Sequence, residues 1–226
     1  MALILSLESA TPVCSVALFE GSKLLDSSHL HIPQSASSRL AVMIDEVLKR
    51  CDVSPKQLNA VAVSSGPGSY TGLRIGVASA KGLCFALSIP LIAVNTLESM
   101  VSQVADRFDE GDLLCPMLDA RRMEVYCLLA LSDGRVIQET QAKVIDESSF
   151  QSELSENKII FFGSGAAKCR DVIQHKNAAF IDNIFPSAVD IGRLAFAKFE
   201  SQSFEDLAGF EPFYLKDFIV KKPKSN

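Results

Sequence analysis

The sequence predicts an α/β fold built from two copies of a βββαβα unit. Three observations support it: the chain opens on short apolar strands separated by turn residues, helical and strand patterns alternate after them, and the second half repeats this order. Self-similarity between halves is typical of an internal duplication. A chain of 226 residues is long enough for one large domain or two small ones.

The first half begins with alternating apolar segments and turn residues that predict three strands, at residues 2–7, 14–19 and 23–32. Apolar residues then recur at helical spacing from Leu40 until Lys49 and Arg50, a favourable positive end for a helix. Next come a β-branched strand at residues 60–63, a long apolar helix at 73–87 and a strand at 91–94. The expected order is βββαβαβ.

The second half reproduces these signals. Strands are expected at residues 113–118, 124–131 and 135–144, then a short helix at 147–154 and a strand at 158–162. An apolar helix at 189–199 and an extended tail at 212–220 end the chain. We therefore expect a first subdomain over 1–105, a second over 106–186, and residues 187–226 packing back onto the first.

A glycine-rich turn between the strand at 60–63 and the following helix is the most distinctive motif. Its glycines include Gly66, Gly68 and Gly72, and a reduced copy with Gly163 and Gly165 follows the strand at 158–162. Backbone amides at a helix N-terminus suit an anion. The spacing nevertheless matches neither the dinucleotide fingerprint nor a P-loop. Two interpretations stay open: the turn binds a ligand, or its glycines let backbones pack closely.

Composition narrows the class of protein. The net charge of −5 and a pI near 5.3 disfavour a main role in binding a polyanion. A lysine-rich end suggests either a solvated tail or a weak RNA contact; it contains Lys216, Lys221, Lys222 and Lys224. Six cysteines are scattered without a Cys-x-x-Cys pair, and the chain opens directly on a strand, so we expect free thiols and a cytoplasmic protein.

The sequence lacks the residue patterns that a membrane span, a metal site or a serine nucleophile would require. The longest apolar stretch, 73–94, is interrupted by Arg74, Lys81 and Pro90, so no membrane span is expected. The three histidines form no pair at metal-binding helical spacing, and no Gly-x-Ser-x-Gly nucleophile motif is present. We expect neither a metal centre nor a catalytic residue.

The helix after the glycine turn is apolar on nearly every side. Small residues such as Gly72 and Gly76 form one strip, Leu73 and Val77 lie on the next, and Arg74 marks a polar edge. A helix of this kind must be covered on more than one side. Its own sheet covers one, and the other cover is either a neighbouring helix or another protein.

Each of the two linked βββαβα halves has an acid at the end of its first strand and a glycine turn after its fourth. This arrangement resembles the ribonuclease-H-like, actin-like superfold of ATPases and sugar kinases. The resemblance implies a nucleotide between the halves. Here Glu8 is followed by Ser9-Ala10-Thr11 and Asp119 by Ala120-Arg121-Arg122, in place of glycine-rich hairpins, which indicates at most weak nucleotide binding. The vestigial nucleotide or anion site would comprise Glu8, Gly66, Gly68, Asp119, Gly163 and Gly165. A small-molecule kinase or ATPase is the alternative function.

The run Ser65-Gly66-Pro67-Gly68-Ser69-Tyr70-Thr71-Gly72-Leu73-Arg74-Ile75-Gly76 resembles the hallmark of the TsaB family. Weaker similarities follow in family order and extend over nearly the whole chain; they lie at residues 5–11, 14–18, 118–126 and 213–216. The resemblance implies a non-catalytic subunit of the bacterial tRNA threonylcarbamoyladenosine machinery. It would pair with a catalytic paralogue, TsaD, and with an ATPase, TsaE, in transferring threonylcarbamoyl to N6 of the adenosine 3' to the anticodon.

The same resemblance implies that tRNA is met mainly through the complex and that the chain needs no cofactor. In the absence of the partner, we expect the apolar surface of the paired helices to drive homodimerisation. Family pairing runs through the two helices of the first subdomain. Mapped onto this sequence, the expected interface comprises Leu40, Met43, Ile44, Val47, Leu73, Arg74, Val77, Ala78 and Lys81. A Val77→Glu or Ala78→Arg change is expected to abolish pairing while leaving the fold intact.

Overall fold

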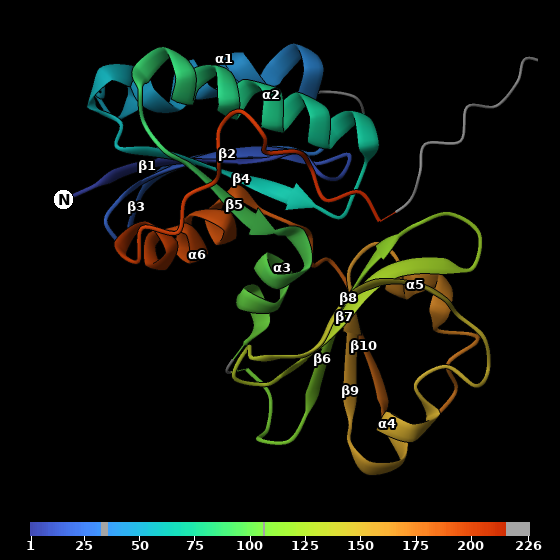
Figure 1. Cartoon of the computed structure of the whole chain (residues 1–226). Helices are drawn as coiled ribbons and strands as arrows, with labels where there is room; N and C mark the ends of the chain where they lie inside the picture. The colour runs from blue at the N-terminus through green and yellow to red at the C-terminus, as the bar shows by residue number, and fades with distance from the viewer. Residues whose placement is uncertain (33–35, 106, 216–226) are drawn as a thin grey trace, which may run out of the picture.

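The first lobe is a five-stranded mixed sheet between helices (Figure 1). The computed structural model describes residues 1–32, 36–105 and 107–215. The strand order is β3-β2-β1-β4-β5. These strands are β1 (Leu3–Glu8), β2 (Cys14–Glu20), β3 (Lys23–Leu30), β4 (Ala60–Gly66) and β5 (Leu91–Asn95). The strand β1 runs antiparallel to β2 and parallel to β4, so the carboxyl ends of β1 and β4 lie together.

Helices cover both faces of this sheet because its strands carry apolar residues on both sides. Helices α1 (Ala36–Arg50) and α2 (Tyr70–Leu87) cover one face, where Leu5 and Val16 pack against Leu40 and Val77. Helix α6 (Ala188–Glu200), from the end of the chain, covers the other. A short 3-10 turn, η1 (Pro55–Gln57), precedes β4.

The second lobe repeats the sheet with the order β10-β9-β6-β7-β8. Its strands are β6 (Leu113–Asp119), β7 (Glu124–Leu131), β8 (Val136–Val144), β9 (Ile159–Phe162) and β10 (Ala178–Ile181), with short helices α4 (Gln151–Glu156) and α5 (Ala166–Cys169). Each strand of this sheet has a counterpart at the same place in the first. The predicted duplicated α/β fold is thus confirmed.

Helix α3 (Thr96–Val104) connects the lobes and covers one face of the second sheet (Figure 1). Asn95 caps it, since Asn95 Oδ1 accepts hydrogen bonds from the amides of Leu97 and Glu98. Its apolar side includes Leu97 and Met100, which pack with Phe162. The lobes are therefore joined by a packed helix.

The predicted strands are all present, and most shifts are of a residue or two. Helix α2 begins at Tyr70 instead of residue 73, because Ser69 Oγ accepts the amide of Gly72 and caps it. The helix expected at 147–154 begins only at Gln151, since Asp146 Oδ1 binds Ser148 and Ser149 in a turn. The sequence reasoning missed α3, α5 and β10.

The expected extended tail at 212–220 is described only in part. Residues 212–215 belong to no helix or strand, and residues 216–220 lie outside the described residues. No helix in the described ranges is long and apolar enough to cross a membrane.

Candidate functional site

The glycines around the start of α2 let this helix approach the turn that follows β1. A Cβ atom added at Gly68 would collide with the backbone of Ala10, and one at Gly72 with the Ser9 carbonyl. One turn further, a Cβ at Gly76 would meet the Ser9 hydroxyl. Ser9 Oγ in turn donates to the Gly72 carbonyl at 2.8 Å. The structure thus supports the interpretation that these glycines serve close packing.

Amides in the same turn are already hydrogen-bonded within the chain. The Ser69 amide donates to the Ala10 carbonyl at 2.6 Å, and the Leu73 amide to the Ser69 carbonyl at 2.9 Å. An anion at this helix start would compete with those acceptors. Anion binding at Gly66 and Gly68 stays a prediction.

Gly66 packs against a different segment, around Phe213. Its φ of +114° favours glycine, and a Cβ there would lie 2.7 Å from the Phe213 carbonyl oxygen. The Phe213 amide donates to the Ser65 carbonyl at 2.7 Å. We call residues 205–215, which run from the start of β5 along α2 to this turn, the C-terminal strap.

Glu8 ends β1 as a completely buried carboxyl group. Burial raises the pKa of Glu8 to about 7, against the opposing effect of the Ala10 amide, which donates to Glu8 Oε1 at 2.5 Å. The Ser64 hydroxyl is close enough to favour the ionised form, yet neither Glu8 Oε2 nor Ser64 Oγ completes a hydrogen bond to any described residue. The first-lobe acid is therefore enclosed by protein, with one polar oxygen unsatisfied.

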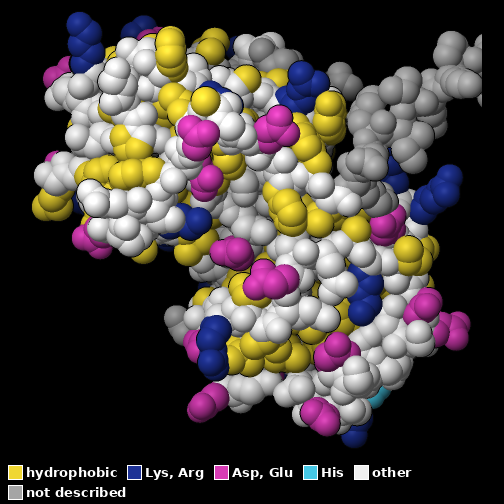
Figure 2. Space-filling view, in the orientation of Figure 1, with side chains coloured by type: hydrophobic (Ala, Val, Ile, Leu, Met, Phe, Trp, Pro, Cys, Tyr) yellow, Lys and Arg dark blue, Asp and Glu magenta, His cyan; other side chains and the backbone are white. Residues whose placement is uncertain are grey.

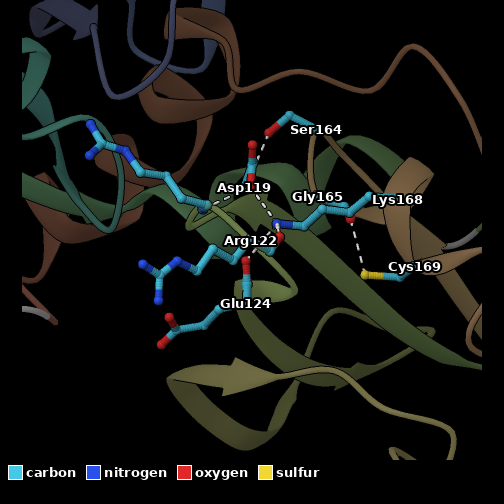
Figure 3. A network of polar contacts seen from close by, with 8 residues as sticks. Asp119, Arg122, Glu124, Ser164, Gly165, Lys168 and Cys169 are labelled. Atoms are coloured by element: carbon cyan, nitrogen blue, oxygen red, sulfur yellow. Dashed lines mark hydrogen bonds and ion pairs between the residues drawn. The ribbon is translucent and has the colours of Figure 1, made fainter.

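Asp119, the equivalent acid of the second lobe, is half exposed but paired with a lysine (Figure 3). Lys168 on α5 donates to Asp119 Oδ1, to the Arg122 carbonyl at 2.6 Å and to the Glu124 carbonyl at 2.8 Å. Partial burial opposes ionisation, but Lys168 and the Arg121 amide outweigh it and lower the pKa of Asp119. An ammonium group thus occupies one side of this carboxylate.

The second glycine turn also packs tightly. Gly163 has a φ of +97° and lies against the Met117 carbonyl, which accepts a hydrogen bond from the Gly165 amide at 2.9 Å. The predicted vestigial site therefore falls into two groups, Glu8, Gly66 and Gly68 in the first lobe and Asp119, Gly163 and Gly165 in the second. Nucleotide binding across them stays a prediction. Within the described ranges, no three His, Cys, Asp or Glu side chains are grouped to hold a metal ion.

Most of the predicted interface residues lie in the core instead of on the surface. Six side chains are at most 8% exposed; they are Leu40, Met43, Ile44, Val47, Leu73 and Val77. All of them except Leu73 belong to the core cluster between the two helices and the sheet. This corrects the expectation that they form a contact surface, because the sheet's wide apolar face needs them. Arg74 and Ala78 are exposed and Lys81 is half-buried, so their role at an interface stays a prediction.

The accessible side of α2 is instead a strip that the sequence reasoning included only in part. We call it the α2 face; it comprises Thr71, Arg74, Ala78, Gly82 and Phe85. The Phe85 side chain is 81% exposed, and a Cβ at Gly82 would have open space around it. The helical spacing of Arg74, Ala78 and Phe85 could have identified this strip in the sequence. A charged residue marks the side of a helix that faces away from the core, and the other two residues lie on the same side. In Figure 2, apolar side chains reach the surface of the upper lobe among charged ones.

The two lobes have sheets of the same strand order, and in each lobe an acid ends the first strand and a glycine turn follows the fourth. These features define a protein of the duplicated actin-like class. A family model described as "TsaD: tRNA N6-adenosine threonylcarbamoyltransferase" matches residues 32–222. The tRNA threonylcarbamoyladenosine biosynthesis protein TsaB of Escherichia coli strain K12 is 30% identical over 227 residues, covering 97% of this chain and 96% of that protein. The chain belongs to the TsaB family.

Two further comparisons agree. The TsaB protein of Bacillus subtilis strain 168 is 28% identical over 219 residues, covering 94% of this chain and 93% of that protein. YeaZ from Pseudomonas aeruginosa has a solved structure that superposes with a TM-score of 0.79 at 25% identity, covering 95% of this chain and all of that one. The similarity therefore spans both lobes.

Proposed function

We propose that this chain is a non-catalytic subunit for tRNA threonylcarbamoyladenosine biosynthesis, and that it acts by binding a catalytic TsaD-like paralogue through the α2 face. The observation that carries the proposal is the exposed α2 face, where the small residues Ala78 and Gly82 lead to Phe85, which is 81% exposed at one end. An exposed aromatic beside small residues is typical of a protein contact, because it offers a large apolar area at little entropic cost.

A paralogue is the favoured partner because the family model for the transferase matches residues 32–222 of this chain. A protein of that fold would bring its own pair of helices on one face of its first sheet. Two related helix pairs can pack about a quasi-twofold axis, by analogy with the twofold axis that is the commonest symmetry of dimers of identical chains. Ala78 and Gly82 would let the helices approach closely.

The proposed role assigns catalysis to the paralogue. Glu8 is enclosed by protein and Asp119 is paired with Lys168, so neither acid is presented as an open catalytic group. A TsaE-like ATPase would join the pair, and tRNA would be met mainly through the assembled complex. Without its partner, the same α2 face would support a homodimer.

The direct test is a titration of the chain with its cognate paralogue. Phe85→Asp should raise the Kd about 30-fold or more, since removing an aromatic side chain that anchors a protein contact typically costs about 2 kcal/mol. Ala78→Arg should do the same by blocking close approach. Val77→Glu is unsuitable, because Val77 is buried and the variant would disturb the fold.

The matched control is Ile137→Asp, which changes a side chain that is 51% exposed on β8 of the second lobe. It should leave the Kd within about twofold, and far-ultraviolet circular dichroism should show all variants folded. Unchanged affinity for both Phe85→Asp and Ala78→Arg would reject the α2 face as the interface.

A further inference from the structure

A groove of about 410 Å³ runs between α2 and the C-terminal strap. One wall comes from α2 and the other from residues more than 120 positions later in the chain. The α2 wall includes Tyr70, Arg74 and Val77, and the strap wall includes Phe210, Pro212 and Tyr214. The groove borders the α2 face, because Arg74 and Ala78 belong to both.

The strap wall is held in place by specific contacts. Lys81 Nζ donates to the Ala208 carbonyl at 3.2 Å and to the Phe210 carbonyl at 2.9 Å. At the other end the Phe213 amide binds the Ser65 carbonyl, and the rings of Tyr214 and Tyr70 lie 5.0 Å apart. Lys81 is therefore a positioning residue for the groove. Its ammonium group donates to backbone carbonyls of the C-terminal strap.

The α2 wall carries positive charge. Helix α2 contains no Asp or Glu, and it presents the exposed Arg74. Arg74 Nη1 donates to the Tyr70 hydroxyl at 3.1 Å, and the guanidinium carbon lies 5.5 Å from the centre of that ring. No salt bridge joins Arg74 to a described residue, although Glu211 lies on the opposite wall. Arg74 thus contacts an aromatic ring and has no carboxylate partner among residues 1–32, 36–105 and 107–215.

We propose that this groove receives an acidic segment of the catalytic paralogue, with a carboxylate on Arg74 and an apolar side chain between Ala78 and the strap. The inference rests on the proposed function, because the groove extends the α2 face as far as the C-terminal strap. Arg74 supplies the charge complementarity and the ring of Tyr214 supplies apolar contact area.

The chain's own end fits the groove poorly as an occupant. Residues 216–226 contain four lysines and one aspartate, so they carry the same sign of charge as the α2 wall. A second copy of the chain would bring the acidic residues Asp45 and Glu46 on the exposed side of α1. The experiment therefore has to separate self-association from paralogue binding.

The test is the Kd for the purified paralogue, measured by isothermal titration calorimetry at low and high salt with the full chain. Arg74→Glu should weaken binding at least tenfold at low salt, and the loss should shrink at high salt, because the variant places a carboxylate against the partner's own and salt screens that repulsion. Tyr214→Ala should weaken it about five- to tenfold. Arg135→Glu reverses an exposed charge at the far turn of the second lobe and should change the Kd less than twofold.

Three results would overturn the proposal. If Arg74→Glu and Tyr214→Ala bind like the wild type while Phe85→Asp loses binding, the groove is rejected and the proposed function stands. If Phe85→Asp and Ala78→Arg also bind normally, the proposed interface fails and the groove with it. If Arg74→Glu disrupts only self-association, seen by sedimentation velocity, the occupant is a second copy.

Discussion

The buried carboxyl group of Glu8 makes the stability of this protein depend on pH in a way that one substitution should remove. Burial raises the pKa of Glu8 to about 7 in the folded chain from the ordinary value of 4.5. A group whose folded pKa is raised binds its proton more tightly in the folded state. Its favourable contribution is complete below pH 4.5 and is lost as the pH rises to about 7.

The size of the effect follows from that difference. Each pH unit between the two pKa values is worth about 1.36 kcal/mol, so the wild type should lose about 3 kcal/mol through Glu8 between pH 4.5 and pH 8. Glu8→Gln keeps the shape of the side chain and cannot ionise. The free energy of unfolding of the variant minus that of the wild type should therefore rise by about 3 kcal/mol over this range.

Urea denaturation followed by circular dichroism at half-unit pH steps would measure both curves. Taking the difference between the two proteins cancels the groups that they share. Glu46→Gln, on the exposed side of α1, is the matched control that separates burial from the substitution itself. A difference for Glu8→Gln that stays constant from pH 4.5 to pH 8 would refute the reasoning.

Three other predictions follow from single contacts. Gly72→Ala should lower the free energy of unfolding by about 2–3 kcal/mol through a collision with the neighbouring backbone, whereas Gly82→Ala, which has open space, should raise it by up to about 1 kcal/mol in the same urea assay. Lys168→Met should lower the Tm by about 2–4 °C at pH 7. Because Lys168 lowers the pKa of Asp119, this decrease in Tm should become smaller as the pH falls through that pKa. A decrease in Tm that does not depend on pH would contradict the pairing. Lys81→Met should speed amide exchange in the C-terminal strap without changing the Tm by more than a few degrees, and unaltered exchange would show that this lysine does not hold the strap.

The strands could be predicted because alternation and turn residues act locally. The turn at Gly21, with φ +60°, connects β2 to β3 where the sequence placed it. Helix α3 was missed because its nine residues mix apolar and polar side chains. Its strongest sequence signal is a single capping residue, Asn95. Strand β10 has four half-buried residues and is recognisable mainly by its pairing with β9.

The candidate interface illustrates a different limit. Leu73 and Ala78 lie on one helix and look equally suited to a contact, yet Leu73 is 1% exposed and Ala78 is at the surface. Periodicity finds an apolar strip but cannot say how much of it the sheet will use. Sequence reasoning expected residues 187–226 to pack back onto the first lobe, but it could not specify the contacts of the C-terminal strap with Ser65 and Lys81, since these join residues far apart in the chain.

The placement of α6 has a consequence for the order in which the protein acquires its structure during synthesis. Ile191 and Ala195 of this helix cover Ile4 and Ala60, which are made near the beginning. The strands of the second lobe lie within one continuous stretch, 113–181, so they can pair before the last residues are made. The sheet of the first lobe keeps one apolar face uncovered until residues 188–200 have been made. The half of the molecule that carries the proposed interface is therefore the last to be completed.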